Sequence, residues 1–361
     1  MRFLFAIQGE GRGHLTQALS LAEMLRHHGH EVVGVLVGRS TLRTLPAFFY
    51  TKIGAPVTEF ETPQFAFDRN NRSVSMFRTL LCNAVLKRLL AFDRGMHLIR
   101  DRIEALCPDR IINFYELLTG FTVRRFGIRI PMTGIAHQFL LNHLLYRHSR
   151  RKGIQGILLR LHAHMTAWGC NDLLALSFQP MPDDFQRHIY VVPPLLRHEA
   201  LEGKASDEGF ILGYMVNNGF ADELQHWCAQ HPQYRFHVFW DCQGRPDLWQ
   251  AESNLTFHRL DDRLFLQLMR RCRGYITTAG FESVCEAMYH RKPMMLIPAH
   301  IEQRINAADA AAAGAGIVSE RFDPGRFTDY LSHGGGSATA QEFRTWVESA
   351  ETHFLELLTR S

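Results

Sequence analysis

The chain has 361 residues, of which 46% are hydrophobic and 21% are charged, and its formal net charge is +4. This length suits two domains of ordinary size, each able to bury its own core. No run approaches the ~18 apolar residues of a membrane helix, and the N-terminal residues lack a signal-peptide pattern. Seven scattered cysteines without a CxxC pair favour free thiols. We therefore expect a cytoplasmic protein rather than a membrane-spanning or disulfide-stapled one.

Charge is divided unevenly between the two halves. Residues 1–165 carry 23 Lys and Arg against 11 Asp and Glu, a net charge of +12, whereas residues 166–361 carry 17 against 25, a net charge of −8. The basic half indicates an anionic partner, such as a membrane surface, a lipid-phosphate acceptor or nucleic acid. No recognised nucleic-acid module accompanies it, so nucleic acid is not expected. The ordinary alternative is a solvated, Arg-rich surface.

The chain opens with the pattern of a β-α-β unit. Arg2–Gln8 is a predicted strand, a glycine-rich turn follows at residues 9–14, Leu15–His28 has helical apolar spacing, and Glu31–Val37 is a second strand. The turn therefore lies at the carboxyl end of the first strand, where open α/β sheets bind ligands.

The turn reads GEGRGH and differs from the dinucleotide-binding fingerprint G-x-G-x-x-G, because His14 stands three residues after Gly11. Arg39 after the second strand leaves an NADP enzyme open as a weaker alternative. His14 at the helix start suits a general base, since imidazole titrates near neutral pH. Glu10 is the competing base, and a helix-cap role is the structural alternative for His14.

The rest of the first half contains two basic amphipathic stretches, at residues 76–103 and 142–165, which either face the core or lie on an anionic membrane. Two strands, ending at Phe114 and Ala136, are followed by Glu116 and His137. Both residues are candidate acceptor contacts, and the alternative for each is an ordinary cap or loop role.

The second half repeats the strand–turn–helix pattern. Asn218 and Gly219 follow a strand at residues 210–216 and form a candidate phosphate loop. The strongest signal is the stretch at residues 277–306, where a strand leads through a turn into a short helix, a buried strand and a polar cluster. A helix start offers N–H groups and a positive dipole end to phosphate. Ser283 and Glu286, three residues apart, can face one ligand from this helix.

These motifs resemble the donor region of GT-B glycosyltransferases that use nucleotide sugars. Among these are the UDP-glycosyltransferases, the lipid-linked peptidoglycan N-acetylglucosaminyltransferase and a bacterial branch that reads roughly GGFE…EA…KP…P…EQ…NA. The resemblance places Ser283 at the phosphate and Glu286 at the ribose. It implies donor-binding roles for Gly11, Gly13, Asn218, Gly219, Leu260, Thr278, Gly280, Ser283, Glu286, Glu302, Gln303 and Asn306.

Four positions depart from the family pattern. Thr278 stands where plant-type enzymes have a phosphate-binding His, and Ala279 replaces a Gly. Glu282 places a carboxylate where others have Asn. Asn113 stands where the similar bacterial branch ends its strand with Asp, which argues against an Asp–His catalytic pair.

The resemblance implies an α/β protein of GT-B fold, with two Rossmann-like domains facing each other across a cleft. We expect an N-terminal acceptor-side domain at residues 1–192, a linker at 193–208, and a nucleotide-sugar domain at 209–340. A C-terminal helix at 341–361 would cross back to the first domain. The implied reaction is inverting transfer to an acceptor hydroxyl, lipid-linked or membrane-associated, without a metal or other cofactor; no Asp-x-Asp pair is present.

Two further hypotheses remain open from the sequence. A UDP-sugar 2-epimerase would use the same fold and donor but would transfer the sugar to no acceptor. A degenerate GT-B module would bind a nucleotide or a partner without catalysis, as the changes at Thr278, Glu282 and Asn113 would suit. Neither the base, the sugar nor the acceptor is specified by these patterns.

Overall fold

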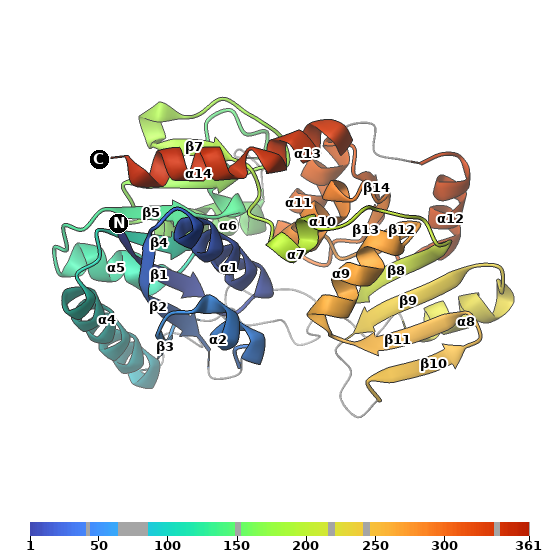
Figure 1. Cartoon of the computed structure of the whole chain (residues 1–361), viewed down its shortest axis with the longest axis horizontal. Helices are drawn as coiled ribbons and strands as arrows, with labels where there is room; N and C mark the ends of the chain where they lie inside the picture. The colour runs from blue at the N-terminus through green and yellow to red at the C-terminus, as the bar shows by residue number, and fades with distance from the viewer. Residues whose placement is uncertain are drawn as a thin grey trace. The chain divides into compact units, whose positions relative to one another are not determined.

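The computed structural model describes residues 1–40, 44–63, 86–148, 153–215, 221–240, 246–335 and 340–360. Contacts divide the chain into two compact units (Figure 1). The first comprises Met1–Arg197 and Glu348–Ser361, and the second comprises His198–Val347. None of the helices within these described ranges is both long and apolar enough to cross a bilayer.

The first unit is built on a parallel sheet whose strand order, among the described residues, is β3-β2-β1-β4-β5-β6-β7. The strands are β1 (Arg2–Gln8), β2 (Glu31–Arg39), β3 (Val57–Glu61), β4 (Arg110–Phe114), β5 (Met132–Ile135), β6 (Asp172–Leu176) and β7 (Ile189–Val192). Most side chains of the central strands β1, β4 and β5 are buried, as expected of a sheet covered on both faces. The strand order reverses between β1 and β4, so this unit has the doubly wound Rossmann arrangement.

Helices cover both faces of this sheet. They are α1 (Arg12–His27), α2 (Ala47–Ile53), α4 (Leu86–Leu106), α5 (Leu117–Arg125), α6 (Ile154–Thr166) and α14 (Ala350–Thr359), with short 3-10 turns η1 (His137–Asn142) and η2 (Phe185–Arg187). The amphipathic stretch predicted at residues 76–103 corresponds to α4 from Leu86 onward, and its first ten residues lie outside the described ranges. Phe92, Ile99 and Ile103 bury one side of α4 in the core. This part of the helix therefore faces the core.

The chain returns to the first unit at its C-terminal end. Helix α14 packs against β7, and the Arg360 guanidinium lies 3.0 Å from the Asp172 carboxylate. The side chain of Arg110 donates to the Arg360 carbonyl at 3.1 Å. The C-terminal helix predicted at residues 341–361 is divided at Ser349 into α13 (Ala340–Glu348) and α14.

The second unit has a sheet of order β10-β11-β9-β8-β12-β13-β14 in the described part of the chain. Only β10 is antiparallel to its neighbour there. The strands are β8 (Phe210–Met215), β9 (Arg235–Trp240), β10 (Leu248–Glu252), β11 (Leu255–Arg259), β12 (Gly274–Thr277), β13 (Met294–Leu296) and β14 (Gly316–Val318). The order reverses between β8 and β12. The second unit is therefore a second Rossmann-like sheet with an added edge strand.

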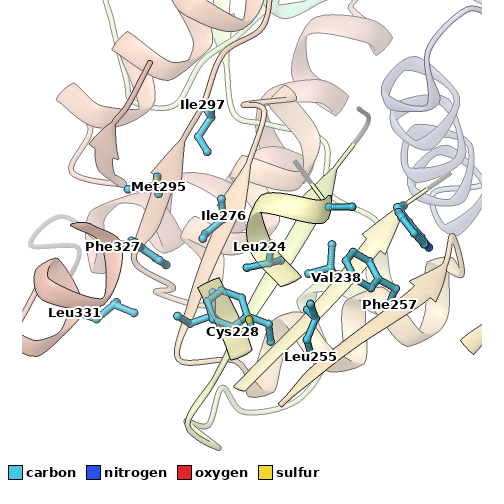
Figure 2. Close-up of a cluster of buried hydrophobic side chains, with 14 residues drawn as sticks. Leu224, Cys228, Val238, Leu255, Phe257, Ile276, Met295, Ile297, Phe327 and Leu331 are labelled. Atoms are coloured by element: carbon cyan, nitrogen blue, oxygen red, sulfur yellow. The ribbon is translucent and has the colours of Figure 1, made fainter. Parts of the chain in front are cut away.

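The helices of the second unit cover its sheet in the same way. They are α7 (His198–Leu201), α8 (Ala221–Gln230), α9 (Asp262–Arg271), α10 (Phe281–Tyr289), α11 (Ile301–Ala312), α12 (Pro324–Ser332) and α13. Figure 2 shows how Leu224 and Cys228 of α8 and Phe327 of α12 pack onto Val238, Phe257 and other strand side chains in one apolar cluster. This buried layer holds the strands in place, and it thereby positions the turns at their carboxyl ends.

Candidate functional site

The first group of candidate residues lies where the strand order of the first unit reverses. Strands β1 and β4 are parallel neighbours, so the residues that follow them meet at one edge of the sheet. Gly9 must lack a side chain, because a Cβ there would come within 2.9 Å of Val37 and 3.0 Å of the Gly38 carbonyl. A Cβ added at Gly11 would have no atom within 4 Å, so packing does not explain why this residue is glycine. It is also the N-cap of α1, with no side-chain capping bond. This helix start can therefore be approached closely by a ligand.

His14 lies in the first turn of α1 and is partly buried. Its Nδ1 is 3.3 Å from the Gln17 Oε1. When Nδ1 carries the proton it donates to Gln17, and Nε2 keeps the lone pair that a general base needs. The ring stacks on Tyr115, with centroids 5.7 Å apart and an interplanar angle of 24°.

Tyr115 follows β4 directly and has a left-handed φ of 60°, a conformation that costs a bulky residue free energy. Its hydroxyl is 3.1 Å from Nδ1 of His162 on α6, and its ring meets Phe139 of η1 edge-on at 5.6 Å. The structure thus brings together side chains from α1, the end of β4 and α6.

Glu10 has a different role from His14 in this arrangement. Its carboxylate accepts a hydrogen bond from the backbone N–H of Ser40, just after β2. That bond ties the turn after β1 to the neighbouring strand. Of the two predicted bases, His14 has the geometry better suited to proton transfer.

Glu116 has a structural setting in this unit, and its predicted acceptor role stays a prediction. The residue is fully buried and caps α5, accepting from the backbone N–H groups of Leu118 and Thr119 and from the hydroxyls of Thr119 and Thr62. Burial raises the pKa of Glu116, and these hydrogen bonds oppose the shift. Asn113 holds the same turn, since its amide accepts from the Glu116 N–H at 2.7 Å and donates to the Glu116 carbonyl at 2.9 Å. Asn113 therefore has a structural reason to be Asn.

His137 is likewise buried. Only 5% of its surface is exposed, and its Nδ1 is 2.7 Å from the Leu176 carbonyl. Its ring packs edge-on against Phe178 at 5.4 Å. His137 thus joins η1 to the end of β6, and its predicted acceptor role stays a prediction.

The second group lies in the second unit, after β12, which pairs with β8 where the strand order reverses. Thr278 and Gly280 are partly exposed, and Gly280 is the N-cap of α10 without a side-chain capping bond. Ser283 donates its hydroxyl to the Gly280 carbonyl at 3.3 Å and is partly buried. Glu286 lies one turn further on and is only 3% exposed. The phosphate and ribose roles of these two residues stay predictions.

Two side chains of α11 support this turn. Gln303 accepts from the Ala299 N–H at 2.9 Å, and its amide nitrogen is 3.4 Å from the Thr278 hydroxyl. Asn306, which is buried, donates to the Ala279 carbonyl at 3.3 Å. Ala279 has a left-handed φ of 64°, so Asn306 holds the backbone at a position where glycine would be the easier residue. Gln303 and Asn306 therefore shape the turn.

The other predicted donor residues of this unit are placed as follows. Glu302 is partly buried in the first turn of α11, so the polar cluster belongs to the helix rather than to a loop before it. Leu260 lies partly buried between β11 and α9. Asn218 and Gly219 lie outside the described residues.

Comparison with known proteins gives this geometry its context. A model of glycosyl transferase family 1 matches residues 1–333. The chain belongs to this family. No curated protein matches the chain in sequence.

Solved structures of glycosyltransferases share the fold. LpCGTa in complex with UDP is 15% identical with a TM-score of 0.67, covering 100% of this chain and 99% of that one. Phytolacca americana UGT2, complexed with UDP-2-fluoroglucose and pterostilbene, is 14% identical with a TM-score of 0.65, covering 99% and 98%. The spinosyn rhamnosyltransferase SpnG, complexed with thymidine diphosphate, is 17% identical with a TM-score of 0.64 over both entire chains. The predicted GT-B fold is confirmed, whereas the narrower resemblance to the lipid-linked peptidoglycan enzyme stays a prediction.

Sequence reasoning missed Tyr115 and His162 in this glycosyltransferase. Tyr115 directly follows a buried strand, which is a usable signal, but the adjacent Glu116 is the more obvious chemical group. Nothing in the sequence around His162 indicates its contact with Tyr115, because α6 lies more than 40 residues further along the chain.

Proposed function

We propose that this glycosyltransferase moves a sugar from a nucleotide diphospho-sugar, a UDP-sugar in the first instance, to an acceptor hydroxyl with inversion and without a metal. The observation that carries the proposal is the pair of open helix starts at the two strand reversals. Gly11 caps α1 and Gly280 caps α10, and neither has a side-chain capping bond. Both starts can present backbone N–H groups to phosphate.

The donor side of the proposal rests on the turn from β12 into α10. Thr278, Ser283 and the N-terminal N–H groups of α10 would bind the diphosphate, and Glu286 would bind the ribose. N–H dipoles fixed in this way stabilise the charge that grows on the departing diphosphate. The UDP and thymidine diphosphate complexes of the structural neighbours support a pyrimidine nucleotide.

The acceptor side rests on His14. Its Nε2 would remove the proton of the acceptor hydroxyl as the acceptor oxygen forms a bond to the anomeric carbon. The bond between that carbon and the diphosphate oxygen breaks, and the nucleoside diphosphate leaves with the electron pair. Attack opposite the leaving group inverts the anomeric centre. Tyr115 would hold the imidazole in orientation.

The acceptor class follows from charge. The strongly basic first half of the chain, at +12 over residues 1–165, fits an acceptor that is lipid-linked or otherwise held at an anionic membrane. The transferred sugar is a hexose or an N-acetylhexosamine. We place the reaction on the cytoplasmic side, at the inner face of the membrane.

A thermal-shift screen tests the donor assignment. Wild type, Glu286→Gln and the exposed control Glu320→Gln would be melted with UDP, dTDP, GDP or CMP in the presence of EDTA. A nucleotide present at ~100 times its Kd stabilises the folded protein by about 2.7 kcal/mol. We expect UDP or dTDP to raise the Tm of wild type and Glu320→Gln by roughly 2–4 °C, and to raise that of Glu286→Gln much less.

The outcomes separate the proposal from its alternatives. No shift with any nucleotide would contradict the transferase and favour a degenerate GT-B module that binds another partner. A shift that is lost with EDTA would contradict metal-free donor binding. Release of a free 2-epimerised sugar from the donor, with no glycosylated product, would replace transfer by epimerisation.

A further inference from the structure

Helix α6 of the first unit exposes an apolar face. Ile154 is 77% exposed, and Ile157 and Leu161 are each 50% exposed. Their spacing of three and four residues places them on one side of the helix. Ala163 and Thr166 face the core instead. Large aliphatic side chains on one side of a helix, each at least half exposed, are typical of an interaction surface rather than of a solvated helix.

Other exposed apolar side chains lie on elements next to this helix. Leu144 and Leu145, which are 48% and 65% exposed, come just after η1, and η1 packs against α6. Trp168, just after the C-terminal end of α6, is 48% exposed and meets Phe121 edge-on at 4.9 Å. We call Leu144, Leu145, Ile154, Ile157, Leu161 and Trp168 the α6 surface.

The sequence segment that contains the α6 surface carries charge of one sign. Between Glu116 and Asp172 the chain has 55 residues with no Asp or Glu and with eight Lys and Arg. Arg160 is exposed on α6 next to Leu161, and Arg147 is exposed shortly after Leu145. A helix with an apolar face flanked by basic residues is suited to the headgroup region of an anionic bilayer.

We propose that the α6 surface docks on an anionic lipid surface. The apolar side chains would enter the boundary between headgroups and acyl chains, while Arg147 and Arg160 contact lipid phosphates. A second copy of the chain is a poorer occupant, because an isologous contact would bring two basic surfaces together. This inference rests on the proposed function and deepens it. His162 of the same helix contacts Tyr115, which stacks on His14. Docking of the α6 surface would therefore bring a lipid-borne acceptor near the candidate base.

Vesicle co-sedimentation tests the inference without using sugar transfer. The full chain would be mixed with vesicles of phosphatidylglycerol and phosphatidylcholine in equal parts, or of phosphatidylcholine alone. The test variant is Ile157→Glu with Leu161→Glu. The matched control is Leu248→Glu, at a 62% exposed leucine on β10 of the second unit. Circular dichroism melting would show that all three proteins are folded.

We expect wild type and Leu248→Glu to sediment with the anionic vesicles, to bind phosphatidylcholine weakly, and to dissociate as salt rises. The double variant should bind anionic vesicles at least ~10-fold more weakly. Equal binding to both vesicle types, or unchanged binding by the folded double variant, would overturn the inference. Lipid-free dimers that the double variant abolishes would assign the surface to a second copy instead. Vesicle binding without sugar transfer would support the surface and reject only the proposed reaction.

Discussion

The imidazole of His14 lies nearly parallel to the phenol ring of Tyr115, with their centroids 5.7 Å apart. Tyr115 is held from its other side by His162, 3.1 Å from the hydroxyl, and its backbone has a left-handed φ of 60°. The orientation of His14 therefore depends on a residue that no simple motif would single out. This relationship joins the start of α1 to the end of β4 at the carboxyl edge of the first sheet.

Substitution of Tyr115 should separate ring stacking from hydrogen bonding. Tyr115→Phe keeps the ring and loses the hydrogen bond between the hydroxyl and His162, whereas Tyr115→Leu removes the stack. Because small misplacements of a catalytic group are costly, we expect Tyr115→Leu to lower kcat roughly 10-fold or more, and Tyr115→Phe to lower it by less. The KM for the donor should change little. Steady-state kinetics would check this, and equal effects of the two substitutions would show that the stack is unimportant.

The left-handed backbone at Ala279 predicts how substitutions there change the free energy of unfolding. Ala279→Gly relieves about 1–2 kcal/mol of backbone strain. This gain is offset by the greater unfolded-state entropy of glycine and by the lost burial of a methyl group. The free energy of unfolding should therefore stay within about 1 kcal/mol of the wild-type value. Ala279→Val places a β-branched residue at φ 64° in a fully buried site and should cost about 2–4 kcal/mol. Urea denaturation distinguishes the two. A valine variant as stable as the glycine variant would contradict the geometry of this turn.

Gly120 on α5 makes a close contact with the segment after α6. A Cβ at Gly120 would lie 2.1 Å from the Trp168 carbonyl oxygen. Because this oxygen belongs to the backbone, it cannot easily move away. We expect Gly120→Ala to destabilise the protein by about 1–3 kcal/mol. Gly325→Ala on α12 is the control, since the nearest atoms to its Cβ position are 3.6 and 3.8 Å away. It should stabilise by up to about 1 kcal/mol. Equal thermal shifts for the two variants would refute the packing argument.

Acid should weaken the second unit through His258. Burial, with a contribution from the neighbouring His237, lowers the pKa of His258 to about 4, and the two rings share a 2.9 Å hydrogen bond. Between pH 4 and 6.5 the unfolded chain holds a proton at this histidine that the folded chain does not. The contribution of His258 to the free energy of unfolding is therefore fully present above pH 6.5. It falls as the pH drops toward 4, by up to about 1.4 kcal/mol per pH unit.

The variant His258→Gln isolates this contribution from that of the other titrating groups. Between pH 7 and pH 5, wild type should lose about 1–2 kcal/mol more stability than His258→Gln. Urea titrations at the two pH values give the comparison. Parallel losses in both proteins would mean that His258 is not the group responsible.

Much of the fold could be predicted because central strands of a doubly wound sheet are continuous apolar runs. β1 was predicted as Arg2–Gln8, and that prediction is confirmed. The strands that were missed lie at sheet edges. They are the exposed β10, the three-residue β14 and β3, which lack such runs. Edge strands bury less and so leave a weaker pattern.

The candidate site was harder to predict than the fold, because a pattern gives a position along the chain but not the direction of a side chain. Tyr115 and Glu116 are adjacent, and the left-handed φ of Tyr115 accompanies its stacking on His14, whereas Glu116 is buried as a helix cap. Gln303 and Asn306 were predicted as ligand contacts, yet their hydrogen bonds support the Thr278–Ala279 turn. Only three-dimensional packing distinguishes these roles.

The most direct measurement is the rate of nucleoside diphosphate release from the nucleotide sugar that the thermal-shift screen selects, with water as the acceptor of the sugar, in EDTA, for wild type and His14→Ala. We predict measurable release by wild type, and a rate roughly 10²–10⁴-fold lower in His14→Ala, with the donor-induced rise in Tm preserved. Release by His14→Ala at the wild-type rate would show that His14 is not the base. No release by wild type, despite donor binding, would contradict the assignment of this chain as an active glycosyltransferase.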